Sequence, residues 1–155
     1  MKEYKIETAL SIKEGFVDIT DPCYSTDVWC RLNKVAVVPG EYDVTAYTIK
    51  KRDWGTRTTE ISIMLSTIKK DEIAHRVSMG SIGVDSGLAG FFIHPKPNYN
   101  DEAWIDFVEN INDSEVIHSI PEGVFVSSGY GDGAYNVTGY LNRSGKCIGL
   151  KIKFM

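Results

Sequence analysis

Apolar side chains recur at every second position along much of this chain, and that spacing constrains the fold more than any other feature. The pattern is clearest near the C-terminus, where Ile148, Leu150, Ile152 and Phe154 alternate with polar or small residues. Because successive side chains of a β-strand point to opposite faces, this segment is expected to bury one face and to expose the other. The chain is therefore expected to be mainly β.

Further segments with the same spacing, or rich in β-branched and aromatic residues, predict additional strands. Two of them flank a polar segment that contains Gly55, which predicts a hairpin with residues 50–57 at its tip. Pro39-Gly40 marks a turn before the first of these two strands, and the run Gly129–Gly133 predicts another turn. The predicted strands cover residues 16–20, 35–38, 42–49, 58–68, 75–84, 90–93, 124–128 and 134–141.

One segment has helical spacing instead. Within residues 101–111, Trp104, Val108 and Ile111 fall at positions i, i+4 and i+7, which places them along one side of a helix. The chain has 155 residues, a length that suits one domain. We therefore expect a single mainly β (α+β) domain over residues 1–155, either an antiparallel β-sandwich or a partly open barrel, with one late inserted helix.

Composition limits the classes of partner and cofactor. Seventeen Lys and Arg residues against 21 Asp and Glu residues give a formal charge of −4, which argues against DNA or RNA binding because that requires a basic face. No apolar stretch is long enough to span a membrane and no signal-peptide core is visible, so a cytoplasmic protein is expected. Three cysteines without a C-x-x-C pair and three scattered histidines predict reduced thiols, no metal site and no cofactor.

The first candidate site is the corner Asp21-Pro22-Cys23-Tyr24, directly after a predicted strand. Proline fixes φ and an aspartate side chain suits an Asx-turn, so a purely structural corner is one interpretation. In the other interpretation, Asp21, Tyr24 and the nearby Trp29 line a ligand pocket. Cys23 has no visible histidine partner, which favours a small buried side chain over a nucleophile.

The second candidate site is the predicted hairpin tip, where Lys50, Lys51, Arg52 and Arg57 surround Trp54. Cations beside an aromatic ring can hold a phosphate and stack a base, which would make Arg52, Trp54 and Arg57 ligand-binding residues. The alternative is a charged hairpin end that only faces solvent.

The third candidate site is the glycine-rich run 80–92, which contains Val84-Asp85-Ser86-Gly87. Glycines let the backbone approach a ligand or a neighbouring strand closely, which makes Asp85 and Ser86 candidate ligand-binding residues. The tetrapeptide resembles the apolar-Asp-Ser/Thr-Gly signature of aspartic proteases, in which two carboxylates share a proton and activate water. Ile148-Gly149-Leu150 resembles the later apolar-Gly-apolar element of that family. The long β region before the motif and the helix soon after it depart from the protease pattern.

The fourth candidate site is the run Ser127–Tyr135. It predicts a hairpin turn, but three glycines within five residues carry a larger entropic cost than a plain turn requires. The alternative interpretation is a loop that presents Tyr130, Asp132 and Tyr135 to a ligand.

The third and fourth runs together resemble an uncharacterised family of small bacterial and phage proteins. The resemblance rests on Gly83–Gly87 followed by Gly90-Phe91-Phe92, and on Gly129–Tyr135 followed by a turn at Gly145 and an apolar last strand. It covers about the C-terminal half of the chain. Relatives often have Tyr-Pro where this chain has Ala134-Tyr135-Asn136, a departure at the edge of the loop. The resemblance implies one β-rich domain and no established activity.

Together, these features favour a non-catalytic binding protein for a small polar ligand, with nucleotide-like molecules favoured by the aromatic and cationic residues. The phage resemblance implies a specific version, a counter-defence protein that sequesters a host signalling nucleotide. One alternative is a protein–protein inhibitor or immunity-type module. Another is a hydrolase using Asp85, either aspartic-protease-like or with a metal ion held jointly with Asp21 and Asp132. A homo-oligomer is expected because symmetric association is common.

The binding hypothesis requires the corners that carry Tyr24, Asp85 and Tyr130 to gather at one end of the β scaffold. No catalytic residue is assigned. The expected ligand-binding residues are Asp21, Tyr24, Trp29, Arg52, Trp54, Arg57, Asp85, Ser86, Tyr130, Asp132 and Tyr135.

Overall fold

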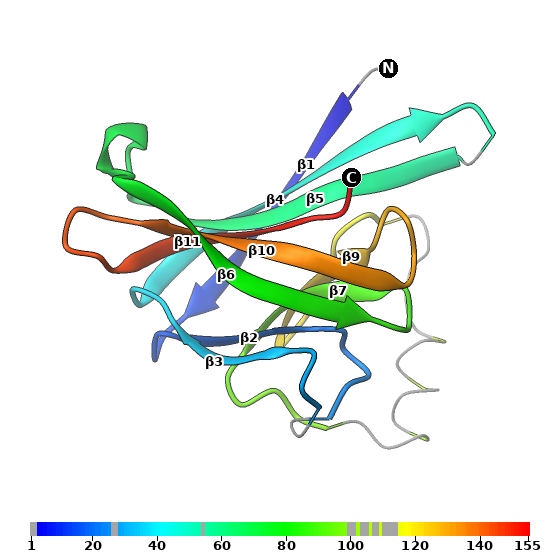
Figure 1. The fold of residues 1–155 in the computed structure, drawn as a ribbon, viewed down its shortest axis with the longest axis horizontal. Helices are drawn as coiled ribbons and strands as arrows, with labels where there is room; N and C mark the ends of the chain where they lie inside the picture. Colours follow the sequence, from blue (N-terminus) through cyan, green and yellow to red (C-terminus); the bar gives the residue numbers. More distant parts are fainter. Residues whose placement is uncertain are drawn as a thin grey trace.

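Two antiparallel β-sheets pack face to face as a sandwich (Figure 1). The computed structural model describes residues 3–25, 28–53, 55–98, 102, 106, 109 and 115–155. The sheets do not close into a barrel, so of the two architectures expected from the sequence the sandwich is confirmed.

The larger sheet has six strands in the order β1-β4-β5-β11-β10-β6, and every neighbouring pair is antiparallel. Its central strands carry the predicted alternation, since Ile148, Leu150 and Ile152 are fully buried whereas Lys153 is exposed. In sheet order, the strands are β1 (Glu3–Ile12), β4 (Gly40–Lys51), β5 (Gly55–Leu65), β11 (Cys147–Lys153), β10 (Gly133–Leu141) and β6 (His75–Val84).

The smaller sheet has five strands in the order β3-β2-β7-β9-β8, again all antiparallel. A single-turn 3₁₀ helix, η1 (Lys70–Glu72), lies between β5 and β6. In sheet order, the strands are β3 (Leu32–Ala36), β2 (Phe16–Thr20), β7 (Leu88–Ile93), β9 (Gly123–Ser127) and β8 (His118–Ile120).

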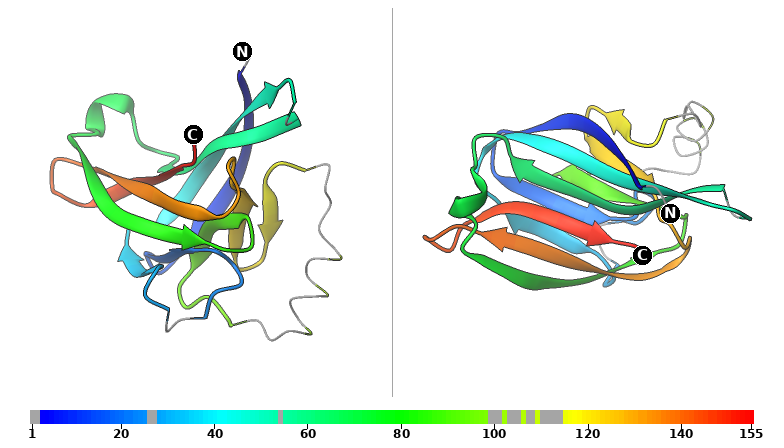
Figure 2. Two further views of the ribbon diagram at one scale, coloured as in Figure 1. Left: turned by 45° about the vertical axis from the view of Figure 1, so that its right-hand side comes forward. Right: turned by 90° about the horizontal axis from the view of Figure 1, so that it is seen from above.

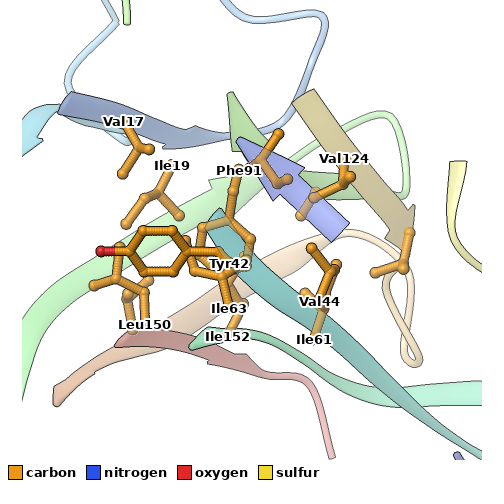
Figure 3. Packing of buried hydrophobic residues seen from close by; sticks show 14 of the residues in the cluster. Val17, Ile19, Tyr42, Val44, Ile61, Ile63, Phe91, Val124, Leu150 and Ile152 are labelled. Atoms are coloured by element: carbon orange, nitrogen blue, oxygen red, sulfur yellow. The ribbon is translucent and has the colours of Figure 1, made fainter. Parts of the chain in front are cut away.

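The inner faces of the two sheets meet in one hydrophobic core, which Figure 3 shows from close by. Val44, Ile61 and Ile63 of the larger sheet face Ile19 and Phe91 of the smaller sheet, and all of them are fully buried. Removing this much apolar surface from water is the main favourable term in folding a chain of this kind.

Gly90 permits an unusually close contact between β7 and β9. A Cβ at this position would lie 2.0 Å from the carbonyl oxygen of Val124 and 2.6 Å from Cα of Phe125. Of the two uses proposed for the glycines of this run, a close approach between strands therefore holds at Gly90.

Strand β1 and strand β8 were not predicted. β1 lies at the edge of its sheet, where only Leu10 and Ile12 near its end are buried, so most of its apolar positions carry no core signal. β8 has three residues, too few to show a period.

The helix expected over residues 101–111 lies mostly outside the described residues, including Trp104, Val108 and Ile111. Glu102, Asp106 and Glu109 are described, and they are helical and exposed.

The ends of the sandwich differ in what they carry. The β4–β5, β6–β7 and β9–β10 connections lie at one end, on the right in Figure 1, and the β10–β11 turn and η1 lie at the other. Figure 2, which turns the molecule in two directions, shows the same separation. The corner after β2 lies at the first of these ends too, because Asp21 is hydrogen-bonded to the β6–β7 turn, so the four candidate segments share one end of the scaffold.

Candidate functional site

Asp21 ties two of the predicted corners together. Its fully buried carboxylate accepts hydrogen bonds at Oδ2 from the backbone N–H groups of Asp85 (2.8 Å) and Ser86 (2.7 Å). Oδ1 accepts from Ser86 Oγ (2.7 Å) and from the backbone N–H of Cys23 (3.0 Å). The Cys23 bond is the Asx-turn that the structural interpretation expects. Asp21 therefore holds the β6–β7 turn against the corner after β2.

Cys23 and Tyr24 are held in protonated form at neutral pH. Cys23 is exposed, not buried as expected, but its Sγ donates to Asp21 Oδ1 across 2.9 Å. Desolvation and Asp21 raise the pKa of this thiol to about 12, so it is a poor nucleophile at neutral pH. Burial and a hydrogen bond with Cys30 raise the pKa of Tyr24 above its ordinary value.

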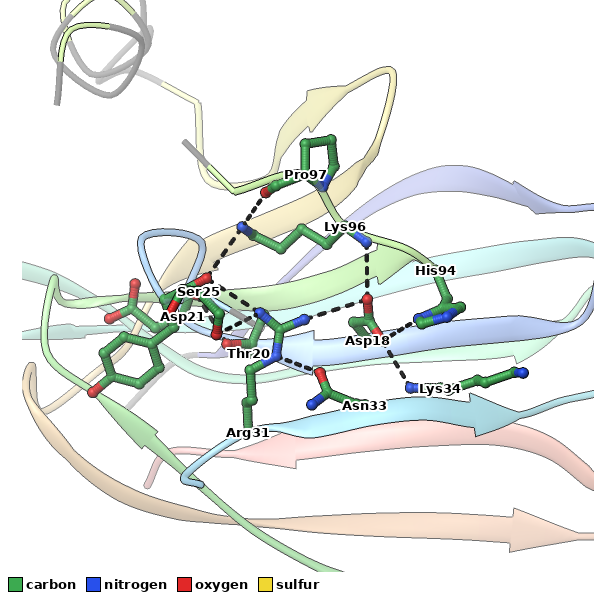
Figure 4. Close-up of polar contacts among 11 residues, drawn as sticks. Asp18, Thr20, Asp21, Ser25, Arg31, Asn33, Lys34, His94, Lys96 and Pro97 are labelled. Atoms are coloured by element: carbon green, nitrogen blue, oxygen red, sulfur yellow. Dashed lines mark hydrogen bonds and ion pairs between the residues drawn. The ribbon is translucent and has the colours of Figure 1, made fainter. Parts of the chain in front are cut away.

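A second buried carboxylate, Asp18, was missed by the sequence reasoning (Figure 4). Its Oδ1 accepts from the backbone N–H of Lys34 (2.7 Å) and lies 2.9 Å from His94 Nδ1, and its Oδ2 accepts from the backbone N–H of Lys96 (2.9 Å). Arg31 Nη2 lies 3.3 Å from Oδ2, as an ion pair without hydrogen-bond geometry. Burial alone would raise the pKa of Asp18, but the bonds from Lys34, Lys96 and His94 outweigh it and hold the pKa below its usual range.

Two buried cations complete this network on the outer face of β2. Arg31 Nη1 donates to the carbonyl oxygens of Tyr24 and Ser25, each across 3.2 Å. Lys96 is only 1% exposed, and its Nζ donates to the carbonyl oxygen of Pro97 across 2.8 Å. Burial and the charge of Arg31 lower the pKa of Lys96 to about 8. The network fixes residues 94–97 and the segment after β2 to each other.

Ser128 connects the β6–β7 turn to the β9–β10 loop. Its backbone N–H donates to the carbonyl oxygen of Gly87 across 2.9 Å, and its Oγ donates to the carbonyl oxygen of Gly131. Tyr135 is buried, and its hydroxyl donates to the same carbonyl across 2.8 Å. Gly131 has φ 82°, a left-handed conformation that favours glycine. These contacts, together with those of Asp21, bring three of the predicted segments into direct contact.

The remaining candidate residues are more dispersed. Tyr130 is 56% exposed, and Lys51 Nζ lies 5.4 Å from the centre of its ring, so this loop meets the β4–β5 hairpin tip. Trp29 is 94% exposed. Arg52, Asp85 and Asp132 are exposed as well, and Trp54 lies outside the described residues.

A polar pocket of about 460 Å³ lies where the β4–β5 hairpin meets the end of β9. Five of its lining residues carry hydroxyl groups, and Arg57 is the cation among the described lining residues. We call it the hydroxyl pocket. Within the part of the chain that the structure describes, Arg57 Nε is buried and has no hydrogen-bond partner. The lining residues are Thr48, Thr56, Arg57, Thr58, Glu115, Val116, Ser127 and Ser128.

The sequence reasoning named only Arg57 of this pocket. Thr48 and Thr58 are buried and sit opposite each other on β4 and β5, next to a register shift in that pair. A threonine in a strand is ordinary, so nothing in the sequence distinguishes these two from other threonines of the hairpin.

No group of three or more His, Cys, Asp or Glu side chains among the described residues is placed to hold a metal ion. No helix within the same residues is long and apolar enough to cross a membrane. Comparisons of this chain with protein-family models, with characterised proteins and with solved structures find no match.

Proposed function

We propose that this protein is a non-catalytic binding protein for a small anionic, nucleotide-like ligand, and that the hydroxyl pocket is its binding site. The observation that carries the proposal is Arg57 Nε, which is buried without a hydrogen-bond partner among the described residues that surround it. A buried donor without an acceptor is costly, whereas a phosphate or carboxylate in the pocket would satisfy it with a charge-assisted bond.

The charge around the hydroxyl pocket favours an anion even though the whole chain carries −4. Arg57 lines the pocket, and Lys50 and Lys51 lie at the end of the neighbouring strand of the same hairpin. Glu115 also lines the pocket, and its carboxylate would accept a hydrogen bond from an amino or hydroxyl group of the ligand. A ligand with an anionic group and a separate donor group satisfies both residues, and a nucleotide has both.

An aromatic ring lies close to this end of the hairpin. Tyr130 is more than half exposed and contacts Lys51. An exposed ring beside a cation can stack a base, which contributes about 1–3 kcal/mol per base. The volume of about 460 Å³ falls within the range of small-molecule sites.

Binding without catalysis fits the chemistry of the pocket. Its described lining residues include hydroxyls and the carboxylate of Glu115, but no histidine, cysteine or lysine. Asp21, one of the carboxylates considered for hydrolysis, accepts hydrogen bonds at both oxygens and serves to hold the β6–β7 turn. In this proposal the protein sequesters its ligand, and the phage resemblance supplies a context in which a host signalling nucleotide would be that ligand.

Isothermal titration calorimetry against mono-, di- and cyclic nucleotides and ADP-ribose tests the proposal. We expect at least one of them to bind, and Arg57→Gln to weaken it about tenfold or more through loss of a charge-assisted bond. Arg52→Gln removes the same charge from the same hairpin outside the pocket lining and should retain most of the affinity.

A second pair of variants separates the pocket from the hairpin surface. Thr58→Val removes a hydroxyl from the pocket without changing its shape and should weaken binding, whereas Thr45→Val, on the same sheet outside the pocket, should not. The proposal would be refuted if the wild type bound none of these nucleotides, or if Arg57→Gln and Arg52→Gln bound the nucleotide with equal affinity.

A further inference from the structure

A second and larger groove lies between β3 with the residues that follow it and β6 with the β10–β11 turn. It has a volume of about 1060 Å³ and shares no described lining residue with the hydroxyl pocket. Its apolar surface comes from Val35 and Val37 on one side and from Val77, Met79 and Leu141 on the other. The groove therefore offers half-buried apolar surface between the outermost strands of the two sheets.

The groove runs along the outermost strand of the smaller sheet. Residues 33–38 line it without interruption. Three backbone N–H groups of this stretch are already bonded, those of Lys34 to Asp18 Oδ1, of Val37 to Gly15 O and of Val38 to Cys147 O, so a further strand would pair with the groups that remain. β3 is the outermost strand of its sheet, and β6 is the outermost strand of the other. A strand edge presents N–H and C=O groups to any chain that lies beside it, which an extended peptide can use and a lipid tail cannot.

The positive charge of the groove favours an acidic occupant. Lys34 and Lys146 line it and are exposed, and none of the other described lining residues is Asp or Glu. On a chain with a net charge of −4, this is a local excess of positive charge. Lys34 has φ 52°, and the bond from its backbone N–H to Asp18 Oδ1 (2.7 Å) holds it in this left-handed conformation.

We propose that this groove binds an extended acidic segment of a partner protein, which adds to β3 as a further strand. Apolar side chains at every second position of the segment contact Val77 and Met79, and its carboxylates pair with Lys34 and Lys146. This goes beyond the proposed function, because ligand binding in the hydroxyl pocket does not require it.

Fluorescence anisotropy with a labelled octapeptide of alternating valine and glutamate tests this proposal on the full chain. Peptides N-methylated at every valine or at every glutamate are the backbone controls. In an extended peptide the N–H groups of all valines point to one edge and those of all glutamates to the other, so each control lacks the N–H groups of one edge only. We expect the parent peptide to bind, and one methylated peptide to bind about tenfold or more weakly while the other retains its affinity. Equal affinities of both methylated peptides for the protein would overturn the added strand.

Charge variants test the other half of the proposal. Lys34→Asn removes the charge and keeps a residue that tolerates positive φ, so it should weaken binding of the glutamate peptide without lowering the melting temperature. Lys146→Gln should act in the same direction, and Lys153→Gln, exposed on β11 outside the groove, should leave affinity unchanged.

The proposal fails if the glutamate peptide does not bind at about 1 mM, or if a peptide of alternating valine and lysine binds equally well. It also fails if hexadecanoate displaces the glutamate peptide and binds more tightly than it, since that would make the groove a lipid site.

Discussion

Lys96 offers a direct test of how the network around Asp18 contributes to stability. Lys96 is 1% exposed, and the pKa of its ammonium group is lowered from 10.5 to about 8, first by burial and then by the charge of Arg31. Between these two pH values the unfolded chain holds a proton at Lys96 that the folded protein has lost, so the free energy of unfolding rises with pH. The interval of 2.5 pH units corresponds to about 3 kcal/mol, of which about 2 kcal/mol falls between pH 7 and pH 9.5.

Lys96→Met removes this titration and keeps an unbranched apolar stem beside Phe92, whose ring centre lies 5.7 Å from Nζ. Urea unfolding of both proteins at about pH 7 and pH 9.5 gives the free energies of unfolding. We expect the wild type to gain about 2 kcal/mol relative to the variant over this range. Cys23, Cys147 and Tyr24, whose pKa values are raised, destabilise both proteins at alkaline pH, and the subtraction cancels their effect.

The exposed Lys153→Met is the control, and its difference from the wild type should not change with pH. If the difference between wild type and Lys96→Met is the same at both pH values, Lys96 is not a desolvated cation and the account of this network is wrong.

Three further changes test the contacts that shape the site. Asp21→Asn leaves one side-chain oxygen to accept the hydrogen bonds that two oxygens accept in the wild type. It should lower the free energy of unfolding by about 1–3 kcal/mol in urea titrations and reduce hydrogen-exchange protection at the Asp85 and Ser86 amides. Gly90→Ala places a Cβ 2.0 Å from Val124 O and should cost about 3 kcal/mol or more, read from the thermal midpoint; a change under 1 kcal/mol would show that β7 and β9 can separate. The pKa of Asp18 is lowered in the folded state, so its contribution is present above the unfolded value near 4 and is lost as pH falls through the folded value. Acid unfolding of Asp18→Asn should therefore begin from a lower stability and show a shallower slope.

The β architecture could be predicted because period-two spacing reports directly on a half-buried strand. β2 and β6 have the predicted bounds, and β11 ends one residue earlier than its apolar pattern. β1 was not predicted because an edge strand buries few residues, so the spacing of its apolar residues gives little indication of a strand.

The site was predictable only where a turn signal marked it. Asp21 and the Asp85-Ser86 turn were both named, and a hydrogen bond between them joins segments 64 residues apart, a pairing that local patterns do not reveal. Trp29 was named for its aromatic ring alone, and the structure leaves it in solvent. Asp18 sits at the polar position of a strand, where spacing indicates an exposed residue, but residues after β7 cover it.

The hydroxyl pocket shows the same limit. Its threonines and serines come from β4, from β5, and from the end of β9 and the residue after it, which only the tertiary fold brings together. Arg57 was predicted as a site residue because it belongs to a cationic cluster in the sequence. Its buried Nε has no hydrogen-bond partner among the described residues, and this follows from packing, which the sequence does not reveal.

Native mass spectrometry of freshly purified protein tests the central claim, that the hydroxyl pocket holds a small anion, most directly. We expect the wild type and Arg52→Gln to carry a common bound mass in the range of a nucleotide, and Arg57→Gln to lack it. After removal of any bound ligand, Arg57→Gln should unfold at the same temperature as the wild type or higher, because the buried Nε without a partner is gone. If Arg57→Gln retains the same bound mass as the wild type, or if the wild type binds no added nucleotide under these conditions, the pocket is not the binding site.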